Sequence, residues 1–354
     1  MKRFDDGLAP MLKLENVAYY TEGKVRILDR RIYPIEVKFV ECKTVIEVRD
    51  AIRNMVTQSA GPYTACGMGM ALAAYETRFL SKEDRRKKMK EAGELLSNAR
   101  PTTVSRMKQV VEGCLMAMDK EKDWTNLDKA LCQHTISSME NRYNKIDLVS
   151  SYLIELFPNK ATIMTQCFGE TIIGMMGRRA NEVEKKLKFV CPETRPFLQG
   201  ARFTASVLSD MGFDVTVITD NMVASYIEEK GVSIFTSAAD SINLDGSVIN
   251  KVGTHQIAIV SKYFGIPYFV TGIPDLQSKS ANDVIIEMRD PEESLSAHHI
   301  KHTKEKVQGY YPAFDITPPH LVSGVVTDIG VYSPYDLVSY EKKIKESGFY
   351  NFAV

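Results

Sequence analysis

From about residue 160 onward, the sequence alternates between short runs rich in β-branched and aromatic residues and stretches of helical character. Two of the helical stretches, GARFTASVLSDMG (200–212) and GTHQIAIVSKYFG (253–265), end in glycine, which commonly stops a helix. Such alternation predicts a parallel sheet with helices on its faces, so we expect an α/β, Rossmann-like domain. The expected strands are ATIMTQ (161–166), a run containing KFV (188–190), DVTVIT (214–219), SIFTSA (233–238), PYFVTG (267–272), DVIIEM (283–288) and SGVVTD (323–328).

The part of the chain before this alternation is rich in helix signals. Residues 81–97 predict a helix with Ser81 as its N-cap, and residues 104–118 place apolar side chains at helical spacing. Upstream, VRILD (25–29) and IEVKFVE (35–41) predict two short strands in a hairpin. We therefore expect a smaller, mixed and mainly helical N-terminal domain over residues 1–145 and a Rossmann-like catalytic domain over residues 146–354.

The composition argues against several classes of partner. Lys plus Arg and Asp plus Glu both number 45, so the net charge is zero and gives no general attraction to nucleic acid or to an anionic membrane. The start of the chain, MKRFDDGLAP, lacks the apolar stretch of a signal peptide, and no apolar run approaches the roughly 18–20 residues of a membrane helix. We expect a cytoplasmic protein that binds neither nucleic acid nor membrane.

The sequence gives no sign of a metal or cofactor. The six cysteines form no C-x-x-C pair and lack zinc-ligand spacing, so we expect reduced thiols. There is no G-x-G-x-x-G, and a dinucleotide is therefore not implied. His298, His299 and His302 are close enough in sequence to bind a metal, but a polar exposed loop or helix face is the interpretation we favour.

Chemically useful side chains follow three of the expected strands. Cys167 comes after ATIMTQ, Asp240 comes after SIFTSA, and the polar segment CPETRPFLQGAR (191–202) follows KFV. Ligands of open α/β sheets bind beyond the carboxyl ends of the strands, so these groups should meet at one rim. Taken singly, the cysteine is more often a small buried hydrophobe and the aspartate a turn cap, and Glu193 and Arg195 can be a structural ion pair. The convergence favours a functional site.

Two further segments have the properties of an anion site. Asn250 and Lys251 lie at an expected helix start, and lysine is a compact charge suited to phosphate. Gln199 and Gly200 open another expected helix, whose N–H groups can bind an anion. The alternative for Lys251 is an ordinary surface lysine.

Several motifs together resemble one family. ETRPFLQGARFTA (193–205) is very similar to the signature of the methylthioribose-1-phosphate isomerases. That superfamily also contains ribose-1,5-bisphosphate isomerases and the regulatory subunits of the exchange factor for translation initiation factor two. The other matching segments, in the same order along the chain, are LDRRIYP (28–34), AIRNM (51–55), ARPTTV (99–104), AADSINLDGSVINKVGT (238–254) and YPAFDITP (311–318).

The resemblance implies an activity and roles for particular residues. Cys167 and Asp240 fall on the family's catalytic pair, which the non-catalytic exchange-factor subunits generally lack. Arg100, Gln199 and Lys251 fall on phosphate-contacting positions, and Asn250 falls on a substrate-contacting position. The resemblance thus implies a homodimeric aldose–ketose isomerase, an intramolecular oxidoreductase, that needs no cofactor and acts on a pentose 1-phosphate in methionine or 5-deoxyribose salvage.

The sequence departs from the family around the expected pocket. Ser59, Ala60 and Gly61 precede Pro62 where the family has Arg-Gly-Ala, so we expect backbone N–H groups of this loop to bind the phosphate. Phe168-Gly169-Glu170 replaces Asn-Thr-Gly after the cysteine, and Ser241 replaces an arginine. The expected substrate is S-methyl-5-thioribose 1-phosphate or 5-deoxyribose 1-phosphate. The alternatives are a non-catalytic sensor of sugar phosphates or nucleotides and a ribose-1,5-bisphosphate isomerase.

The reaction itself suggests how the pair divides the work. Phosphate on the anomeric oxygen prevents spontaneous ring opening, so an acid for the ring oxygen and a group for the C2 hydrogen are needed. We assign the acid to Asp240, kept protonated by the apolar neighbours Ala238, Ala239 and Ile242. Cys167, as a thiolate favoured by Lys251 or Arg195, would carry the hydrogen as a proton, with a hydride shift as the open alternative.

Overall fold

The structure, a computed structural model, describes residues 3–100, 104–297 and 300–346. The contacts between Cα atoms divide the chain into two compact units, with the division between Asn144 and Lys145. Helix α6 (Leu127–Leu156) begins in the first unit and ends in the second.

The N-terminal unit combines a small antiparallel sheet with helices. The sheet has the order β1 (Ala18–Thr21), β2 (Lys24–Leu28) and β3 (Phe39–Cys42). The pairing of β2 with β3 confirms the predicted hairpin, and β1 adds a four-residue strand that the sequence analysis missed. The helices of the unit, besides the start of α6, are η1 (Pro10–Leu12), α1 (Leu14–Val17), α2 (Val45–Arg53), α3 (Gly61–Glu76), α4 (Lys82–Ser97) and α5 (Val104–Lys120).

Helix α3 is the buried centre of this unit. Nearly all its residues are buried, and small side chains let neighbouring elements approach closely. A Cβ atom on Gly67 would lie 2.5 Å from the Thr135 hydroxyl oxygen of α6. Helix α4 covers part of the unit and starts as predicted, because the Ser81 hydroxyl accepts a hydrogen bond from the Asp84 N–H at 3.1 Å.

The C-terminal unit is built on a seven-stranded sheet, which confirms the predicted α/β fold. Its order is β15-β14-β10-β7-β4-β5-β6, and all strands but β15 run parallel. Numbered along the chain, the six parallel strands therefore lie in the order 3-2-1-4-5-6 of a Rossmann sheet. The strands are β4 (Thr162–Met164), β5 (Lys188–Pro192), β6 (Asp214–Ile218), β7 (Ile234–Ala238), β10 (Tyr268–Thr271), β14 (Gly324–Thr327) and β15 (Gly330–Tyr332).

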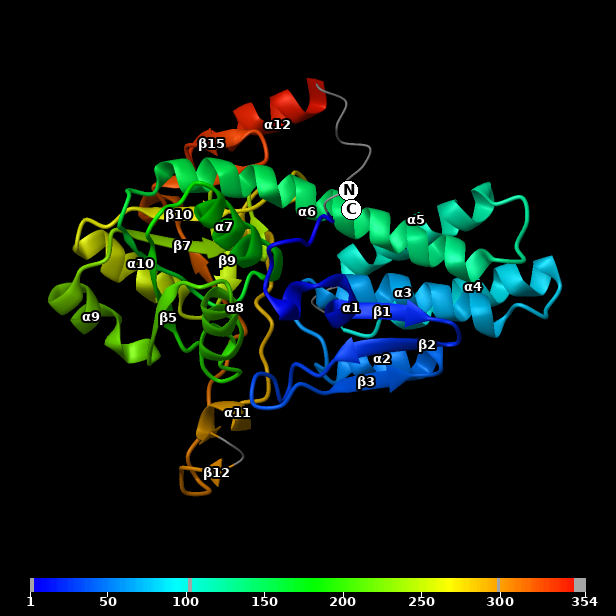
Figure 1. The fold of residues 1–354 in the computed structure, drawn as a ribbon. Helices are drawn as coiled ribbons and strands as arrows, with labels where there is room; N and C mark the ends of the chain where they lie inside the picture. Colours follow the sequence, from blue (N-terminus) through cyan, green and yellow to red (C-terminus); the bar gives the residue numbers. More distant parts are fainter. Residues whose placement is uncertain (1–2, 101–103, 298–299, 347–354) are drawn as a thin grey trace. The chain divides into compact units, whose positions relative to one another are not determined.

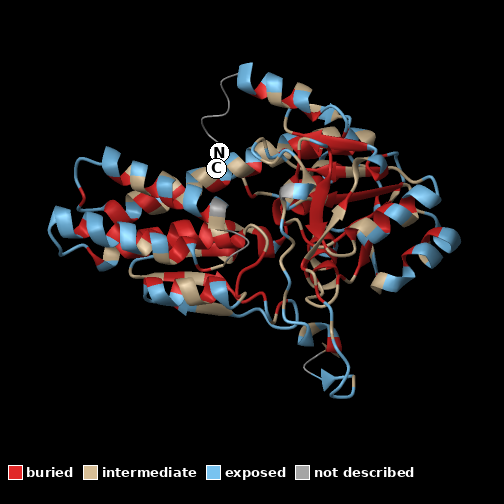
Figure 2. Cartoon of the chain, turned by 180° about the vertical axis from the view of Figure 1, so that it is seen from behind, coloured by how far each residue is buried: buried red, intermediate tan, exposed pale blue. Residues whose placement is uncertain are grey.

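Helices cover this sheet in two groups (Figure 1). Helix α7 (Glu170–Glu182) packs against α8 (Ala205–Asp210), and α9 (Val223–Lys230) packs against α10 (Thr254–Tyr263). Right-handed crossovers on either side of the first strand put the two groups on opposite faces. The buried strands form the centre of the unit in Figure 2, and their core side chains include Met164, Val190, Phe235, Val270 and Val325.

One expected strand is absent from the described structure. DVIIEM (283–288) forms no named strand; the 3-10 helix η5 (Ala281–Asp283) stands at its start, and a single bridge joins Met288 to Pro312. The prediction was wrong because a β-rich sequence needs a free sheet edge to pair with, and β14 and β15 complete that side of the sheet. Ile285 is 95 % exposed there, as expected outside a core.

A second, smaller sheet lies outside the main one. It has the order β13 (Phe314–Thr317), β9 (Val248–Lys251) and β8 (Ser241–Ile242), all antiparallel. Asn250 and Lys251 thus end a strand and do not start a helix, which corrects our prediction. Helix α10 begins only at Thr254, because Gly253 takes the left-handed conformation (φ 102°) that separates the two elements.

The remaining elements are short connections and one terminal helix. They are η3 (Gly200–Thr204), η4 (Asp220–Met222), α11 (Glu292–Leu295), the hairpin of β11 (Ser296–Ala297) and β12 (Ile300–Lys301), η6 (Pro319–Leu321) and α12 (Leu337–Glu346). Among the described residues, no helix has the length and apolar character needed to span a membrane.

Candidate active site

The strand order creates a crevice between β4 and β7. These neighbouring strands start the two halves of the sheet, and their connections leave in opposite directions. Cys167 follows β4 by three residues and Asp240 follows β7 by two. The two loops touch, because a Cβ atom on Gly169 would lie 2.6 Å from the Ala238 Cβ. The thiol and the carboxyl group therefore lie where an open α/β sheet binds its ligand.

Hydrogen bonds to the Cys167 backbone fix the position of its side chain. Its φ is 56°, which is uncommon for a residue with a side chain. Its N–H donates to the Thr194 hydroxyl oxygen at 3.2 Å, and its carbonyl oxygen accepts from the Thr204 hydroxyl. Both threonines come from the segment between β5 and α8, so two chain segments fix the orientation of the thiol.

The surroundings of the thiol keep it protonated at neutral pH. Burial raises the pKa of Cys167 to about 11, against the lowering effect of Lys251, of the Phe168 N–H and of Arg289, while Asp240 raises it further. Lys251 thus acts in the expected direction, but burial has the larger effect. The thiolate that we expected in the resting protein is therefore a minor species.

Asp240 has a different environment from the one predicted. Its side chain is exposed, and its backbone N–H donates to the Ile249 carbonyl oxygen at 2.9 Å. Ala239 and Ile242, which were expected to surround the carboxyl group, pack in the hydrophobic core instead. These neighbours therefore do not enclose the carboxyl group, and its protonation stays a prediction.

Lys251 is a buried cation rather than a surface lysine. It is 5 % exposed, and its ammonium group donates to the Ala313 carbonyl oxygen at 2.8 Å and lies 4.7 Å from the centre of the Phe314 ring. Asn250 is also 5 % exposed, and its amide donates to the Thr254 hydroxyl at 3.0 Å. Lys251 is close enough to Cys167 to lower the pKa of its thiol, whereas the Asn250 side chain is tied to the start of α10.

Asp315 lies beside this cation on the paired strand. Its carboxylate accepts hydrogen bonds from the Gly253 N–H at 2.7 Å and from the His255 N–H at 3.2 Å, at the start of α10. Burial raises the pKa of Asp315 to about 6, although these hydrogen bonds and Lys251 lower it. Asp315 therefore fixes the turn between β9 and α10, and with it the position of Lys251.

The loop after β5 supplies Gln199 to the same rim. Gln199 is 8 % exposed and stands at the N-terminus of η3, and its Oε1 atom makes no hydrogen bond within the described part of the chain. The following Gly200 is required, because a Cβ atom there would lie 1.8 Å from the Pro192 carbonyl oxygen. The loop is tied to β4 through the Thr194 hydroxyl, which donates to the Gln166 side chain at 3.4 Å.

Arg195 has a structural position and not the predicted one beside the thiol. Its guanidinium group donates to the carbonyl oxygens of Ser296 at 2.6 Å and Glu293 at 3.4 Å. It thereby ties the loop after β5 to α11 and β11. The cations that do act on Cys167 are Lys251 and Arg289.

Arg289 and Tyr311 belong to the site and were missed by the sequence analysis. Both act electrostatically on the Cys167 thiol or on each other, and Tyr311 is 3 % exposed. The Arg289 N–H donates to the Tyr311 carbonyl oxygen at 2.9 Å. A signal was present for Tyr311, since it opens the motif YPAFDITP, but the region of Arg289 was taken for an ordinary strand end.

The other predicted phosphate-binding residues lie in the N-terminal unit. Ser59 (φ 57°) and Ala60 precede Gly61, the first residue of α3. The fully buried Arg30 reaches this loop: its guanidinium donates to the Gln58 carbonyl oxygen at 2.7 Å and would lie 3.3 Å from a Cβ atom on Gly61. Arg100 is half-buried, shortly after the end of α4. The structure thus gives the loop a neighbouring cation that the sequence analysis did not assign.

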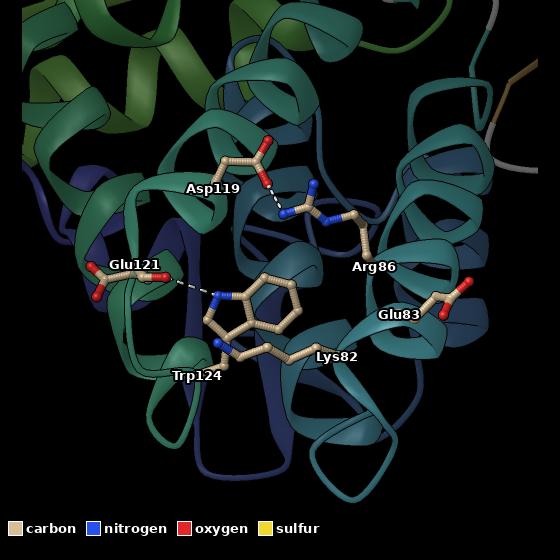
Figure 3. A pocket seen from close by; sticks show the side chains of 6 residues that line it. All are labelled: Lys82, Glu83, Arg86, Asp119, Glu121 and Trp124. Atoms are coloured by element: carbon tan, nitrogen blue, oxygen red, sulfur yellow. Dashed lines mark hydrogen bonds and ion pairs between the residues drawn. The ribbon is translucent and has the colours of Figure 1, made fainter.

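A cavity of about 390 Å³ in the N-terminal unit contains none of the predicted site residues (Figure 3). Two of its charged side chains, Arg86 and Asp119, form an ion pair at 2.8 Å. The Trp124 N–H donates to the Glu121 carbonyl oxygen at 3.1 Å. This cavity is lined by Lys82, Glu83, Arg86, Asp119, Glu121 and Trp124.

The described residues contain no group of three or more His, Cys, Asp or Glu side chains suited to a metal ion. His298 and His299 of the histidine cluster lie outside the described residues. All six cysteines are free thiols, as predicted.

Comparison with known proteins agrees with this arrangement. Residues 63–334 match the initiation factor 2 subunit family, which covers more than half of the chain. The chain belongs to the initiation factor 2 subunit family. Among curated relatives of this family member are the methylthioribose-1-phosphate isomerases of Carboxydothermus hydrogenoformans, 33 % identical over 93 % of this chain and 97 % of the relative, and of Acetivibrio thermocellus, 33 % identical over 90 % and 96 %. The resemblance inferred from the motifs is confirmed.

Solved structures of the initiation factor 2 subunit family share the fold. The 5-methylthioribose 1-phosphate isomerase of Pyrococcus horikoshii OT3 has a TM-score of 0.83 at 29 % identity, over 94 % of this chain and 96 % of that one. The translation initiation factor eIF-2B subunit delta from A. fulgidus has a TM-score of 0.82, also at 29 % identity, over 93 % and 99 %. Since the two are equally similar in shape, the fold alone does not separate an isomerase from a translation factor.

Proposed function

We propose that this chain is an aldose–ketose isomerase that converts S-methyl-5-thioribose 1-phosphate to the corresponding ribulose 1-phosphate. The observation that carries the proposal is a half-buried thiol and a carboxyl group on adjoining loops at the sheet's switch point, with a buried lysine that acts on the thiol. Curated relatives that share about a third of the residues over nearly the whole chain are named methylthioribose-1-phosphate isomerases. A purely structural role does not explain the buried Gln199 Oε1 atom, which makes no hydrogen bond to any residue that the structure describes.

The chemistry needs two groups in this place. The bond between C1 and the ring oxygen must break, the ring oxygen must gain a proton, and the hydrogen on C2 must move to C1. In our proposal Asp240 gives the proton to the ring oxygen, and Cys167 takes the hydrogen from C2 and returns it to C1. As the ketone forms, the C2 hydroxyl releases its proton, which restores Asp240. Because all these steps are proton transfers within one substrate, the reaction requires no cofactor.

Cys167 can take the C2 hydrogen as a proton only after its thiol ionises. Burial raises the Cys167 pKa to about 11. Either substrate binding must lower this pKa, or a base must take the thiol proton. A substrate phosphate near Lys251 would compete for that cation and would leave Arg289 as the cation that assists ionisation. A hydride shift from C2 to C1 remains the alternative route, in which the thiol would accept only the hydroxyl proton.

The phosphate contacts in this proposal are those that the family resemblance implies. They are the side chains of Gln199, Asn250, Lys251 and Arg100 and the backbone of Ser59, Ala60 and Gly61. Helix N-termini and successive backbone N–H groups bind anions without cationic side chains. The Arg30 guanidinium behind the loop adds positive charge to it.

Three other functions follow from the same family. A ribose-1,5-bisphosphate isomerase would need a second anion site for the 5-phosphate, and a 5-deoxyribose 1-phosphate isomerase would need a smaller pocket at that end. The structural likeness to the translation factor subunit is the observation behind a non-catalytic sensor, although the isomerase structure is as similar. Retention of both Cys167 and Asp240 supports the enzyme.

Phosphorus NMR decides among these functions. The protein is incubated with S-methyl-5-thioribose 1-phosphate, 5-deoxyribose 1-phosphate or ribose 1,5-bisphosphate, and the signal of the anomeric phosphate is followed. We expect it to convert to a primary phosphate signal, fastest with the methylthio sugar. Binding of all three without conversion of any would establish the sensor instead.

We also propose a homodimer, which the family resemblance implies. Sedimentation at micromolar concentration should give a species of twice the chain mass of 39.8 kDa. A monomer across that range of concentrations would contradict the proposal and would leave the isomerase assignment intact.

A further inference from the structure

Gln166 is a buried side chain that joins two segments of the candidate site. It directly precedes Cys167 and is 4 % exposed. Its Nε2 atom donates a hydrogen bond to the Val252 carbonyl oxygen at 3.2 Å. Val252 directly follows Lys251. This bond therefore connects the residue before the thiol to the residue after the lysine.

The orientation of the Gln166 amide is fixed by the groups that it faces. The Val252 carbonyl oxygen can only accept a hydrogen bond, so the amide nitrogen must point toward it. The amide oxygen then faces the Thr194 hydroxyl at 3.4 Å. That hydroxyl has a single proton, and the Pro192 carbonyl oxygen at 3.2 Å also accepts it. The bond to Val252 is therefore the stronger contact of the amide.

The turn that contains Val252 is also held from its other side. The Val252 N–H donates to the Ala313 carbonyl oxygen at 3.2 Å, and the Lys251 ammonium group donates to the same oxygen at 2.8 Å. Gly253 lets the Gln166 side chain come close, since a Cβ atom on Gly253 would lie 3.0 Å from the Gln166 Nε2 atom. Movement of the Val252 carbonyl oxygen would therefore move the backbone that carries Lys251.

The Cys167 loop has a separate attachment to the segment after β5. The Cys167 N–H donates to the Thr194 hydroxyl oxygen at 3.2 Å. The Asp220 carboxylate accepts a hydrogen bond from the Thr194 N–H at 2.8 Å, and Thr194 has a left-handed backbone (φ 64°). The loop is thus fixed without Gln166, and what Gln166 adds is its distance from the turn after β9.

The charges that act on the Cys167 thiol come from three segments. Lys251 and Arg289 lower its pKa, whereas Asp240 raises it. The effect of a charge weakens with distance, so the spacing between the loop and the turn sets the effect of the lysine. Arg289 and Asp240 belong to other segments of the chain, and the bond from Gln166 to the turn does not set their distance.

We infer that Gln166 is a positioning residue that holds the Cys167 loop against the turn that carries Lys251. The inference rests on the proposed isomerase function, in which the thiol must lose its proton near a cation. A thiol at the wrong distance from the lysine would ionise less readily and would meet the substrate in a poorer geometry. Gln166 acts through these two residues and does not itself take a proton.

The test is Gln166→Met, which keeps the length of the side chain, adds no charge and removes the hydrogen bond to Val252. We expect kcat to fall by about tenfold, because the thiol and the lysine lose their fixed spacing. Alkylation of Cys167 by iodoacetamide at about pH 8, measured by peptide mass spectrometry, should slow by about threefold, because the thiolate fraction falls. Gln166→Asn, whose shorter amide does not reach Val252, should give the same results and serves if the methionine variant does not fold.

Two further variants separate positioning from stability. Thr165→Val is the matched control, because the buried Thr165 hydroxyl donates to the Val190 carbonyl oxygen at 3.4 Å in the same segment of the chain. It should leave kcat and the alkylation rate unchanged. In a Lys251→Met background, Gln166→Met should slow alkylation no further, because the cation is already gone. A residue that only stabilises the fold would not show this dependence on the lysine.

Two results would overturn the inference. If Gln166→Met slows alkylation by the same factor with and without Lys251, then Gln166 does not act through the lysine. If Gln166→Met lowers only the thermal midpoint, its role is structural. Failure of the proposed function gives a different result, since wild-type protein would then convert none of the three sugar phosphates. Alkylation rates that still depended on Lys251 would in that case support the positioning role without the isomerase.

Discussion

The loops after β4 and β7 adjoin each other, but their reactive groups differ in exposure to solvent. Cys167 is half-buried, its backbone is fixed by Thr194 and Thr204, and desolvation raises its pKa to about 11. Asp240 is exposed, and its apolar neighbours turn into the core. A group that must be shielded from water and a group that must reach a ring oxygen have different needs, and neighbouring loops can meet them separately.

The largest fall in kcat should come from changing Cys167. Cys167→Ser keeps the size of the side chain but raises its pKa far above that of a thiol, so kcat should fall by at least about a hundredfold. Cys191→Ser is the matched control. Burial raises the pKa of Cys191, as desolvation does for Cys167, but Cys191 lies at the end of β5. Steady-state kinetics and the thermal midpoint are measured on both. A Cys167→Ser variant that keeps more than about a tenth of the rate would remove the proton-carrying role from this residue.

Asp240→Asn should lower kcat by a similar factor, about a hundredfold, because the amide keeps the shape but has no proton to give. Since Asp240 is exposed, the thermal midpoint should barely change. A substrate whose ring oxygen leaves C1 more readily needs less help from an acid. If such a substrate restores the rate of the Asp240→Asn variant, the acid role of Asp240 is supported. If kcat falls equally for every substrate and KM rises, Asp240 has a role in binding instead.

The pH dependence sharpens the contrast between the two groups. A thiol pKa of about 11 in the free protein means that the thiolate fraction grows about tenfold per pH unit below that value. In the Asp240→Asn variant, where the acid no longer titrates, the residual kcat/KM should therefore rise about a hundredfold from pH 7 to pH 9. Rate measurements with a stability control at each pH check this. A flat profile over that range would show that Cys167 does not act as a thiolate in the rate-limiting step.

Lys251→Met removes a charge and keeps most of the buried volume. Loss of a charge-assisted contact of roughly 1.5–3 kcal/mol should raise KM by roughly 10- to 100-fold. Because Lys251 lowers the Cys167 pKa, the alkaline rise of kcat/KM should also move to higher pH. Titration of substrate binding by calorimetry gives the first effect and the pH profile gives the second. An unchanged KM would exclude Lys251 from the phosphate site.

The smallest effect should come from separating the two loops. Gly169→Ala places a methyl group 2.6 Å from the Ala238 Cβ, so the loops must move apart and kcat should fall by about tenfold. Gly177→Ala on the same helix meets the flexible Met211 side chain at 3.0 Å and serves as the control. Equal kinetics of the two variants would show that the spacing of the loops does not matter.

Much of the catalytic half could be predicted from sequence. Strands β4, β5, β6, β7, β10 and β14 were each expected within a residue or two, because buried parallel strands are apolar runs between helix signals. The rule that ligands bind at carboxyl strand ends was enough to select Cys167 and Asp240. The chain pattern failed at DVIIEM, where strand propensity had no sheet edge to pair with, and at Asn250 and Lys251, whose strand pairs with residues more than 60 positions later.

The sequence by itself determined the alternation of strands and helices, the residues that end them and the family to which the chain belongs, because these depend on local patterns and on motifs. Only the tertiary structure decided the environment of each group. Burial of the thiol, exposure of Asp240, the route of Arg195 to Ser296, and the arrival of Arg289 and Tyr311 beside Cys167 depend on segments that lie 50 to 150 residues apart. The pKa of a group is set by whatever surrounds it in space, and spacing along the chain does not report that.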